Sequence, residues 1–207
     1  MRKIKLVAIA LITVASYSCK EVKKEKKETQ VTIEDTFTVS QDSTKVSFTA
    51  YKTTAKKGVG GKFTKIDVKN ARQASSAIEA IEGLEFSIPV SSLFTNDATG
   101  TRDPKIKEFF FGVMDNTEFI SGTFKFDSEH KCYVDLKLNG VSAKLPIDCV
   151  VTENRYVTFK GVLNLEKWNA LDALASLNKV CEVLHTGEDG VSKTWSDVTI
   201  EASTYLR

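Results

Sequence analysis

Short blocks in which every second residue is apolar recur along this chain from Val31 onward. Alternation of this kind places one face of a strand on an apolar interior and the other in water, because successive side chains of a strand point to opposite sides. Many half-buried strands predict a mainly β fold, an antiparallel barrel or sandwich. The blocks cover residues 46–50, 84–90, 120–126, 134–138, 141–147, 157–163 and 198–202.

The apolar face of these blocks holds several of the 12 phenylalanines in the chain. Such a face either packs into a solid core or lines a lumen that a slender apolar ligand can enter, and composition alone does not choose between the two. We take the inward positions as the candidate ligand-binding residues of the lumen. They are Phe48, Phe86, Ile88, Phe124, Phe126, Val134, Leu136, Leu145, Ile147, Phe159, Leu163, Val198 and Ile200.

Helical segments interrupt the strand pattern. Apolar residues recur at steps of three and four over residues 168–184, which predicts one longer amphipathic helix lying against the sheet. A short helical turn is expected over residues 104–111, with Asp103 as its N-cap and Pro104 as its first helical residue. A second short turn is expected over residues 74–81.

The pair Asn139-Gly140 lies between two alternating blocks and predicts a tight hairpin. A two-residue turn sets Cys132 opposite Ile147, whereas a four-residue loop sets Cys132 opposite Cys149. In the first register the two cysteines are diagonal neighbours with Cα atoms about 7 to 8 Å apart, which is hard to bridge. In the second register a disulfide is feasible, so the pattern leaves a Cys132–Cys149 bond open.

The N-terminus has the layout of a secretory signal over residues 1–18, with a basic lead, an apolar run and a short polar stretch. The apolar run, residues 6–15, is too short to span a bilayer, which needs about 20 residues. Cys19 follows, and its place predicts lipidation of the thiol and a membrane anchor. The charged residues after it indicate a flexible tether over residues 19–30, and the globular domain is then expected over residues 31–207. The alternative is an ordinary signal with an incidental cysteine.

The charge of the domain excludes one class of partner. The formal charge of the chain is +2. Removing Arg2, Lys3 and Lys5, and then the five lysines and three glutamates of residues 20–29, leaves the body with about −3. We therefore expect no nucleic-acid binding, which needs a basic surface.

The sequence has no common catalytic or metal-binding signature. His185 has acidic neighbours, Glu182, Glu188 and Asp189, but without a second histidine or a cysteine in step these residues indicate a helix end and a solvated turn. Apart from Cys19 the chain has three cysteines, so at least one thiol stays unpaired, and we interpret these thiols as buried apolar residues. We expect neither an enzyme nor a metal site nor a cofactor other than a bound lipid.

Three stretches, in order, resemble the YceI-like family. Residues 46–50 with 58–63 resemble the first hairpin of that family. Residues 84–93, followed by Arg102-Asp103 and Phe109-Phe110, are similar to its core strand, Arg-Asp step and Phe-Phe pair. Residues 136–147 resemble its Gly-Val hairpin, with Asn139 where histidine is common.

The resemblance spans about residues 37–206. It implies a closed eight-stranded antiparallel lipocalin-like barrel whose interior binds a long isoprenoid or other lipid chain, and it transfers no catalytic residue. The helix expected over residues 168–184 departs from the family pattern.

These observations together predict an exported, lipid-anchored envelope protein, at the outer membrane, that holds the tail of a long-chain isoprenoid, quinone or other amphiphilic lipid. Its expected partners are this lipid and, through Cys19, a membrane. The oligomeric state stays open. Two alternatives remain, a membrane-tethered interaction module with a solidly packed barrel, and an enzyme that uses an accessible thiol of low pKa.

Overall fold

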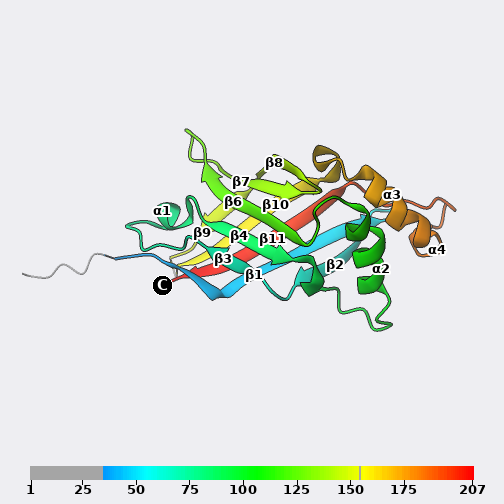
Figure 1. Cartoon of the computed structure of the whole chain (residues 1–207), viewed down its shortest axis with the longest axis horizontal. Coiled ribbons are helices and arrows are strands. Elements are labelled where there is room, and N and C mark those ends of the chain that lie inside the picture. Colours follow the sequence, from blue (N-terminus) through cyan, green and yellow to red (C-terminus); the bar gives the residue numbers. More distant parts are fainter. Residues whose placement is uncertain (1–34, 154) are drawn as a thin grey trace, which may run out of the picture. The chain divides into compact units, whose positions relative to one another are not determined.

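The computed structural model describes residues 35–153 and 155–207, and this part of the chain is mainly β (Figure 1). The predicted signal segment, Cys19 and the tether over residues 19–30 lie outside the described residues. Each of the alternating blocks falls on a strand, as predicted. The described strands are β1 (Val39–Lys52), β2 (Lys57–Phe63), β3 (Asp67–Lys69), β4 (Glu85–Pro89), β5 (Leu93–Phe94), β6 (Phe119–Phe126), β7 (Cys132–Leu138), β8 (Val141–Pro146), β9 (Asp148–Val151), β10 (Tyr156–Asn164) and β11 (Asp197–Leu206).

Hydrogen bonds join the described strands into two sheets whose neighbours are antiparallel. The larger sheet has the order β5-β2-β1-β11-β10-β9, and the smaller has the order β3-β4-β6-β7-β8. The single closed eight-stranded barrel that we expected is thus divided, in its hydrogen bonds, into sheets of six and five strands. The chain itself links the two sheets, because β8 leads into β9 across Ile147 and β2 leads into β3 across residues 64–66.

The corner between β8 and β9 explains part of this division. Pro146 ends β8 and has no N–H to donate, and Ile147 then turns the chain into the other sheet. Gly161 of β10 faces this corner. A Cβ atom on Gly161 would lie 2.8 Å from the carbonyl oxygen of Pro146 and 2.6 Å from Cδ1 of Ile147, so the missing side chain allows the corner to approach β10.

The helical segments only partly match their predicted ranges. The described helices are α1 (Ala77–Ile81), α2 (Arg102–Phe109), α3 (Leu171–Val180) and α4 (Glu182–His185), and the 3₁₀ turns are η1 (Val90–Ser92), η2 (Phe111–Val113) and η3 (Leu165–Trp168). Figure 1 shows α2, α3 and α4 at one end of the sheets and α1 at the other. Among the described residues, no helix is long and apolar enough to cross a membrane.

Two helical predictions were wrong in detail. Asp103 is not an N-cap and Pro104 is not the first helical residue, because α2 already begins at Arg102 after Thr101. The Asp103 carboxylate instead accepts hydrogen bonds from Thr95. The single helix expected over residues 168–184 is divided into η3, α3 and α4. Asn169 has a left-handed backbone (φ 52°) that ends η3, and Cys181, with φ −110° and ψ 13°, separates α3 from α4.

The Asn139-Gly140 turn has the two-residue register. Leu138 pairs with Val141, and both turn residues have positive φ, 50° and 70°, as a type I′ turn requires. The Ile147 N–H accordingly donates to the Cys132 carbonyl at 3.1 Å. The Asn139 side chain also joins two neighbouring segments, because its amide donates to the carbonyls of Trp168 and Asn169 at 3.0 Å.

The most tightly packed side chains lie toward the two ends of the sheets. Trp168 is fully buried beside α3, and its indole N–H donates to the Leu136 carbonyl at 2.9 Å. Toward the other end, Ile81 of α1 is also fully buried. Val157, Thr204 and Leu206, near the start of β10 and the end of β11, are as deeply buried.

Candidate functional site

The interior between the two sheets contains an apolar cavity of about 200 Å³. Its wall comes from strands of both sheets and from α2, η2 and α3, and no polar atom is exposed on the wall. In an unrelated protein, an engineered apolar cavity of about 150 Å³ stays dry and binds benzene. A cavity of this kind therefore suits hydrocarbon better than water. The cavity is therefore the strongest candidate for a functional site.

The strand alternation located this wall well. The inward positions that line the cavity are Phe48, Phe86, Ile88, Phe124, Val134, Leu136, Leu145, Ile147, Phe159, Leu163, Val198 and Ile200. Phe126 is the one candidate that does not line it. Phe126 is the last residue of β6, where it pairs with Cys132 and packs against the core instead, and its N–H donates to the Glu82 carboxylate at 2.8 Å.

Aromatic rings shape the cavity from both sheets. The rings of Phe124 (β6) and Phe159 (β10) approach across the interior, with centroids 4.8 Å apart. Phe86 lies against Phe124 at 5.8 Å, and on the larger sheet Phe48 lies against Phe63 at the same distance. Tilted rings at these distances pack favourably, so the aromatic wall keeps its form.

Residues outside the strands complete the wall, and the sequence analysis did not predict them as lining residues. Ile106 and Phe110 contribute from α2 and the residue after it, and Leu174 and Leu177 contribute from α3. The two leucines belong to the three-and-four-residue apolar pattern of residues 168–184, which predicted a helix against the sheet. Trp195, before β11, had no such signal.

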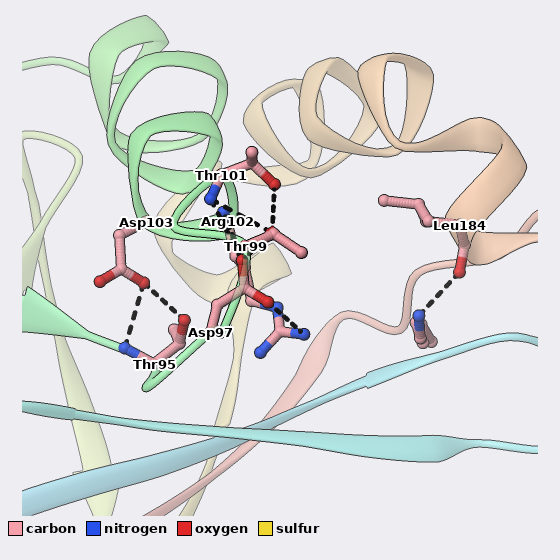
Figure 2. Close-up of polar contacts among 8 residues, drawn as sticks. Thr95, Asp97, Thr99, Thr101, Arg102, Asp103 and Leu184 are labelled. Carbon is pink, nitrogen blue, oxygen red and sulfur yellow. Dashed lines mark hydrogen bonds and ion pairs between the residues drawn. The ribbon is translucent and has the colours of Figure 1, made fainter.

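A polar loop positions α2 beside the cavity (Figure 2). Asp97 accepts hydrogen bonds from the backbone N–H groups of Thr101 and Arg102 and from the Thr99 hydroxyl, and Arg102 pairs with it at 3.4 Å. The Thr99 hydroxyl is the main cause that lowers the pKa of Asp97. The Arg-Asp step singled out in the sequence thus has a structural role: Arg102 and Asp103 fix the two sides of this loop.

The cysteines within residues 35–153 and 155–207 are free thiols. Cys132 and Cys149 are close enough for a hydrogen bond between their thiols, and this bond together with burial raises the pKa of Cys132. The same hydrogen bond lowers the pKa of Cys149, so the surroundings make Cys132, but not Cys149, a poor nucleophile.

The acidic residues around His185 form no metal site. Within the described ranges, no group of three His, Cys, Asp or Glu residues is arranged to hold a metal ion. His185 Nδ1 instead lies 3.1 Å from Asn178 Oδ1 and 2.7 Å from Thr194 Oγ1. This polar cluster joins α3 and α4 to the segment before β11.

Comparisons with known proteins agree with this geometry. The family model of the YceI-like domain matches residues 37–205. A solved polyisoprenoid binding domain from Saccharophagus degradans, implicated in plant cell wall breakdown, is 10% identical and superposes with a TM-score of 0.59 over 83% of this chain and 97% of its own. BcnA of Burkholderia cenocepacia is 14% identical, with a TM-score of 0.51 over 82% of this chain and 99% of its own. No curated protein matches the sequence significantly.

Proposed function

We propose that this chain, which belongs to the YceI-like domain family, binds the hydrocarbon tail of an amphiphilic lipid in the cavity between its sheets and performs no catalysis. The ligand class is a long-chain isoprenoid, a quinone or a similar lipid. The observation that supports this proposal most directly is the cavity, on whose wall no polar atom is exposed and whose lining is mainly the inward apolar side chains of both sheets. The Saccharophagus relative is a polyisoprenoid binding domain, which supports the same ligand class.

The two sheets, in this proposal, act as one eight-stranded barrel. The count is eight when β2 with β3, β4 with β5, and β8 with β9 are each taken as one bent strand. β4 then pairs with β3 while β5 pairs with β2, so this bent strand bridges both sheets. Such a barrel has an interior wide enough for side chains or for one small ligand.

Solvation supplies the binding energy. Each methylene moved from water into the cavity gains about 0.8 kcal/mol. Association costs oppose this gain, yet a tail of about ten carbons still leaves several kcal/mol in favour of binding. Because the wall exposes no polar atom, it offers no hydrogen bond to a polar competitor.

The place of action is a second part of the proposal. The signal layout of residues 1–18 and the position of Cys19 support export and lipidation, with the domain held near the outer membrane by a charged tether. Metabolic labelling with a radioactive fatty acid tests this part: the parent chain takes up label, and Cys19→Ser does not. Equal labelling of both chains would refute the anchor at Cys19.

Lipid extraction from the purified full chain, followed by mass spectrometry, tests the ligand. We expect a long-chain lipid in the parent and much less in Ala202→Phe, because Ala202 lines the cavity and the added ring occupies it. Ala71→Phe is the matched control, because Ala71 is exposed. Repeated recovery of empty protein, with no thermal shift on addition of isoprenoid quinones, would overturn the proposal and leave the tethered interaction module.

A further inference from the structure

The turn of α4 exposes large apolar side chains next to one another. Val183 is 88% exposed and Leu184 is 57% exposed. Val180, at the end of α3, and Val191, in the returning loop, are also exposed. We call these four residues the apolar tip. Apolar side chains gathered in this way mark a surface that contacts a partner or a membrane more often than scattered ones do.

Several bonds hold the apolar tip in place. The Lys52 ammonium donates to the Leu184 carbonyl at 2.7 Å, a contact that Figure 2 draws at the labelled Leu184. The Lys193 N–H donates to the His185 carbonyl at 3.2 Å, and Thr186 pairs with Ser192 as an isolated bridge. The chain therefore fixes these side chains in an exposed position.

Basic residues and a tryptophan surround the tip. The ammonium groups of Lys193 and Lys56 lie over the Trp195 ring, 3.8 and 4.8 Å from its centroid. Lys57 and Arg102 are near enough to Lys52 to contribute, after burial, to lowering its pKa. Among the described residues, none of the four lysines forms an ion pair with a carboxylate.

We call the basic residues around the tip, Lys52, Lys56, Lys57, Lys193 and Arg102, the basic rim. Acidic residues also occur on this segment, but they do not neutralise the positive charge of the rim. Glu182 and Glu188 are exposed. The Asp189 carboxylate is occupied by the Val191 N–H and by the Thr54 hydroxyl, which is the main cause that lowers its pKa. Arg102 is paired with Asp97, and the four lysines Lys52, Lys56, Lys57 and Lys193 still outnumber these three carboxylates, so the rim favours an anionic partner.

The tip is continuous with the wall of the cavity. Leu177 and Trp195 line the cavity, Leu177 lies on the helix that ends at Val180, and Trp195 carries the two lysines of the rim. An apolar surface with a tryptophan and lysines at its border is the pattern of an interfacial membrane segment.

We propose that the apolar tip and its basic rim dock on the surface of a lipid bilayer that contains anionic headgroups. Val183 and Leu184 enter the boundary between headgroups and acyl chains, and the lysines contact the headgroups. Docking places the α3 and α4 end of the cavity against the membrane. In this position the membrane and the cavity exchange a lipid. Only this exchange rests on the proposed function; the docking itself does not.

Quenching of tryptophan emission tests the docking. The full chain is bound to vesicles of equal parts brominated phosphatidylcholine and phosphatidylglycerol. Trp195 emission is quenched by bromine if the tip docks, and Trp195→Phe, which leaves only the buried Trp168, shows little quenching. This readout is local to Trp195 whether or not the N-terminus also inserts into the vesicle. Because Trp195 also lines the cavity, the measurement is repeated in Ala202→Phe, whose filled cavity leaves only quenching from the bilayer.

The variant Val183→Ser with Leu184→Ser removes the apolar contact. We expect the lipid concentration for half-maximal quenching to rise by at least about tenfold. The matched control is Val150→Ser with Val151→Ser, a pair of exposed valines on β9, which are 56% and 40% exposed and lie outside the tip. Equal quenching in the tip variant and the parent, or no quenching of the parent, overturns the proposal.

The charge of the rim is tested separately. Lys56→Gln with Lys193→Gln should weaken binding by roughly fivefold for each lysine removed, and only on vesicles that contain phosphatidylglycerol. Lys45→Gln with Lys69→Gln, two exposed lysines on β1 and β3, is the control. Docking that is equally strong on pure phosphatidylcholine overturns the anionic part. Vesicle docking without any lipid in the extract would refute the proposed function alone, and lipid recovery without docking would refute this inference alone.

Discussion

The interior of this domain has two kinds of region, packed layers toward the ends of the sheets and a cavity between them. In the packed layers, Trp168 and Ile81 are fully buried. On the cavity wall, Phe48, Phe86 and Phe124 face inward from the strands but are only half-buried, whereas other wall residues, such as Val134 and Phe159, are buried. The same alternation of apolar residues therefore serves both a solid core and a hollow.

The difference lies in what enters the space between the strands. Trp168 comes from η3 and Ile81 from α1, so both packed layers receive a large side chain from a helical segment outside the alternating blocks. The central layer also receives side chains from α2, η2, α3 and the segment before β11, but these border the cavity and do not fill it. What fills the space between the two sheets is thus decided largely by the segments that connect the strands.

Truncation of Trp168 should give the largest contrast between the two regions. Trp168→Ala should lower the free energy of unfolding by about 3–5 kcal/mol, because it leaves a cavity and removes the partner of the Leu136 carbonyl. Phe48→Ala should cost clearly less, since its ring already lacks neighbours on one side. Urea unfolding of both variants measures the difference, and equal losses would mean that the wall is as tightly packed as the end.

Enlargement of an alanine should give opposite results in the two regions. Ala173 is 3% exposed within the packed layer of α3, so Ala173→Leu should destabilise the protein by about 1–3 kcal/mol through overpacking. Ala202 lines the cavity, so Ala202→Leu has room for the added atoms and should leave stability unchanged or raised. Thermal unfolding of lipid-free protein checks the pair. Destabilisation by both variants to the same degree would contradict an open cavity.

A third pair of variants concerns the corner where β8 leaves the smaller sheet. Gly161→Ala places a Cβ atom 2.8 Å from the Pro146 carbonyl oxygen, a backbone atom that cannot rotate away, so we expect a loss of about 1–2 kcal/mol. Gly60→Ala is the control, since its nearest atom would be 3.9 Å away. Both variants are compared by urea unfolding, and a neutral Gly161→Ala would show that the corner adjusts freely.

The strand content could be predicted because each strand signal is local. Alternation fixed which residues of β6, β7, β10 and β11 face inward, and Asn139-Gly140 fixed where one hairpin turns. The register of that hairpin could not be chosen from the pattern, because both registers kept the same apolar face inward. The division into two sheets was also hidden, since part of it comes from the corner at Pro146, whose close approach to Gly161 is a contact between separate strands.

The site was predictable to the same extent as the strands. Alternation predicted twelve positions of the wall correctly. It also predicted Phe126, which does not line the cavity because β6 ends at this residue. The contributions of Ile106, Phe110 and Trp195 depend on how α2 and the segment before β11 fold back over the sheets, which is a tertiary property. The break of α3 from α4 at Cys181 was missed for a related reason: the apolar spacing continues through a residue whose backbone is not helical.

The smallest expected effect concerns His185, which joins α4 to the segment before β11 and fills neither interior region. Burial, and secondarily the charge of Lys52, lower the pKa of His185 from 6.5. The unfolded chain therefore takes up this proton at a higher pH than the folded chain does, so stability falls as the pH drops from about 6.5 toward the folded-state pKa. His185→Gln, which cannot take up a proton, should flatten this part of the profile while leaving the loss of stability near pH 4, where carboxylates titrate, in place. Urea midpoints measured from pH 7 to pH 4 test this prediction. If the midpoint falls with pH equally in parent and variant above pH 5, His185 is in free contact with water and does not link α4 to the segment before β11.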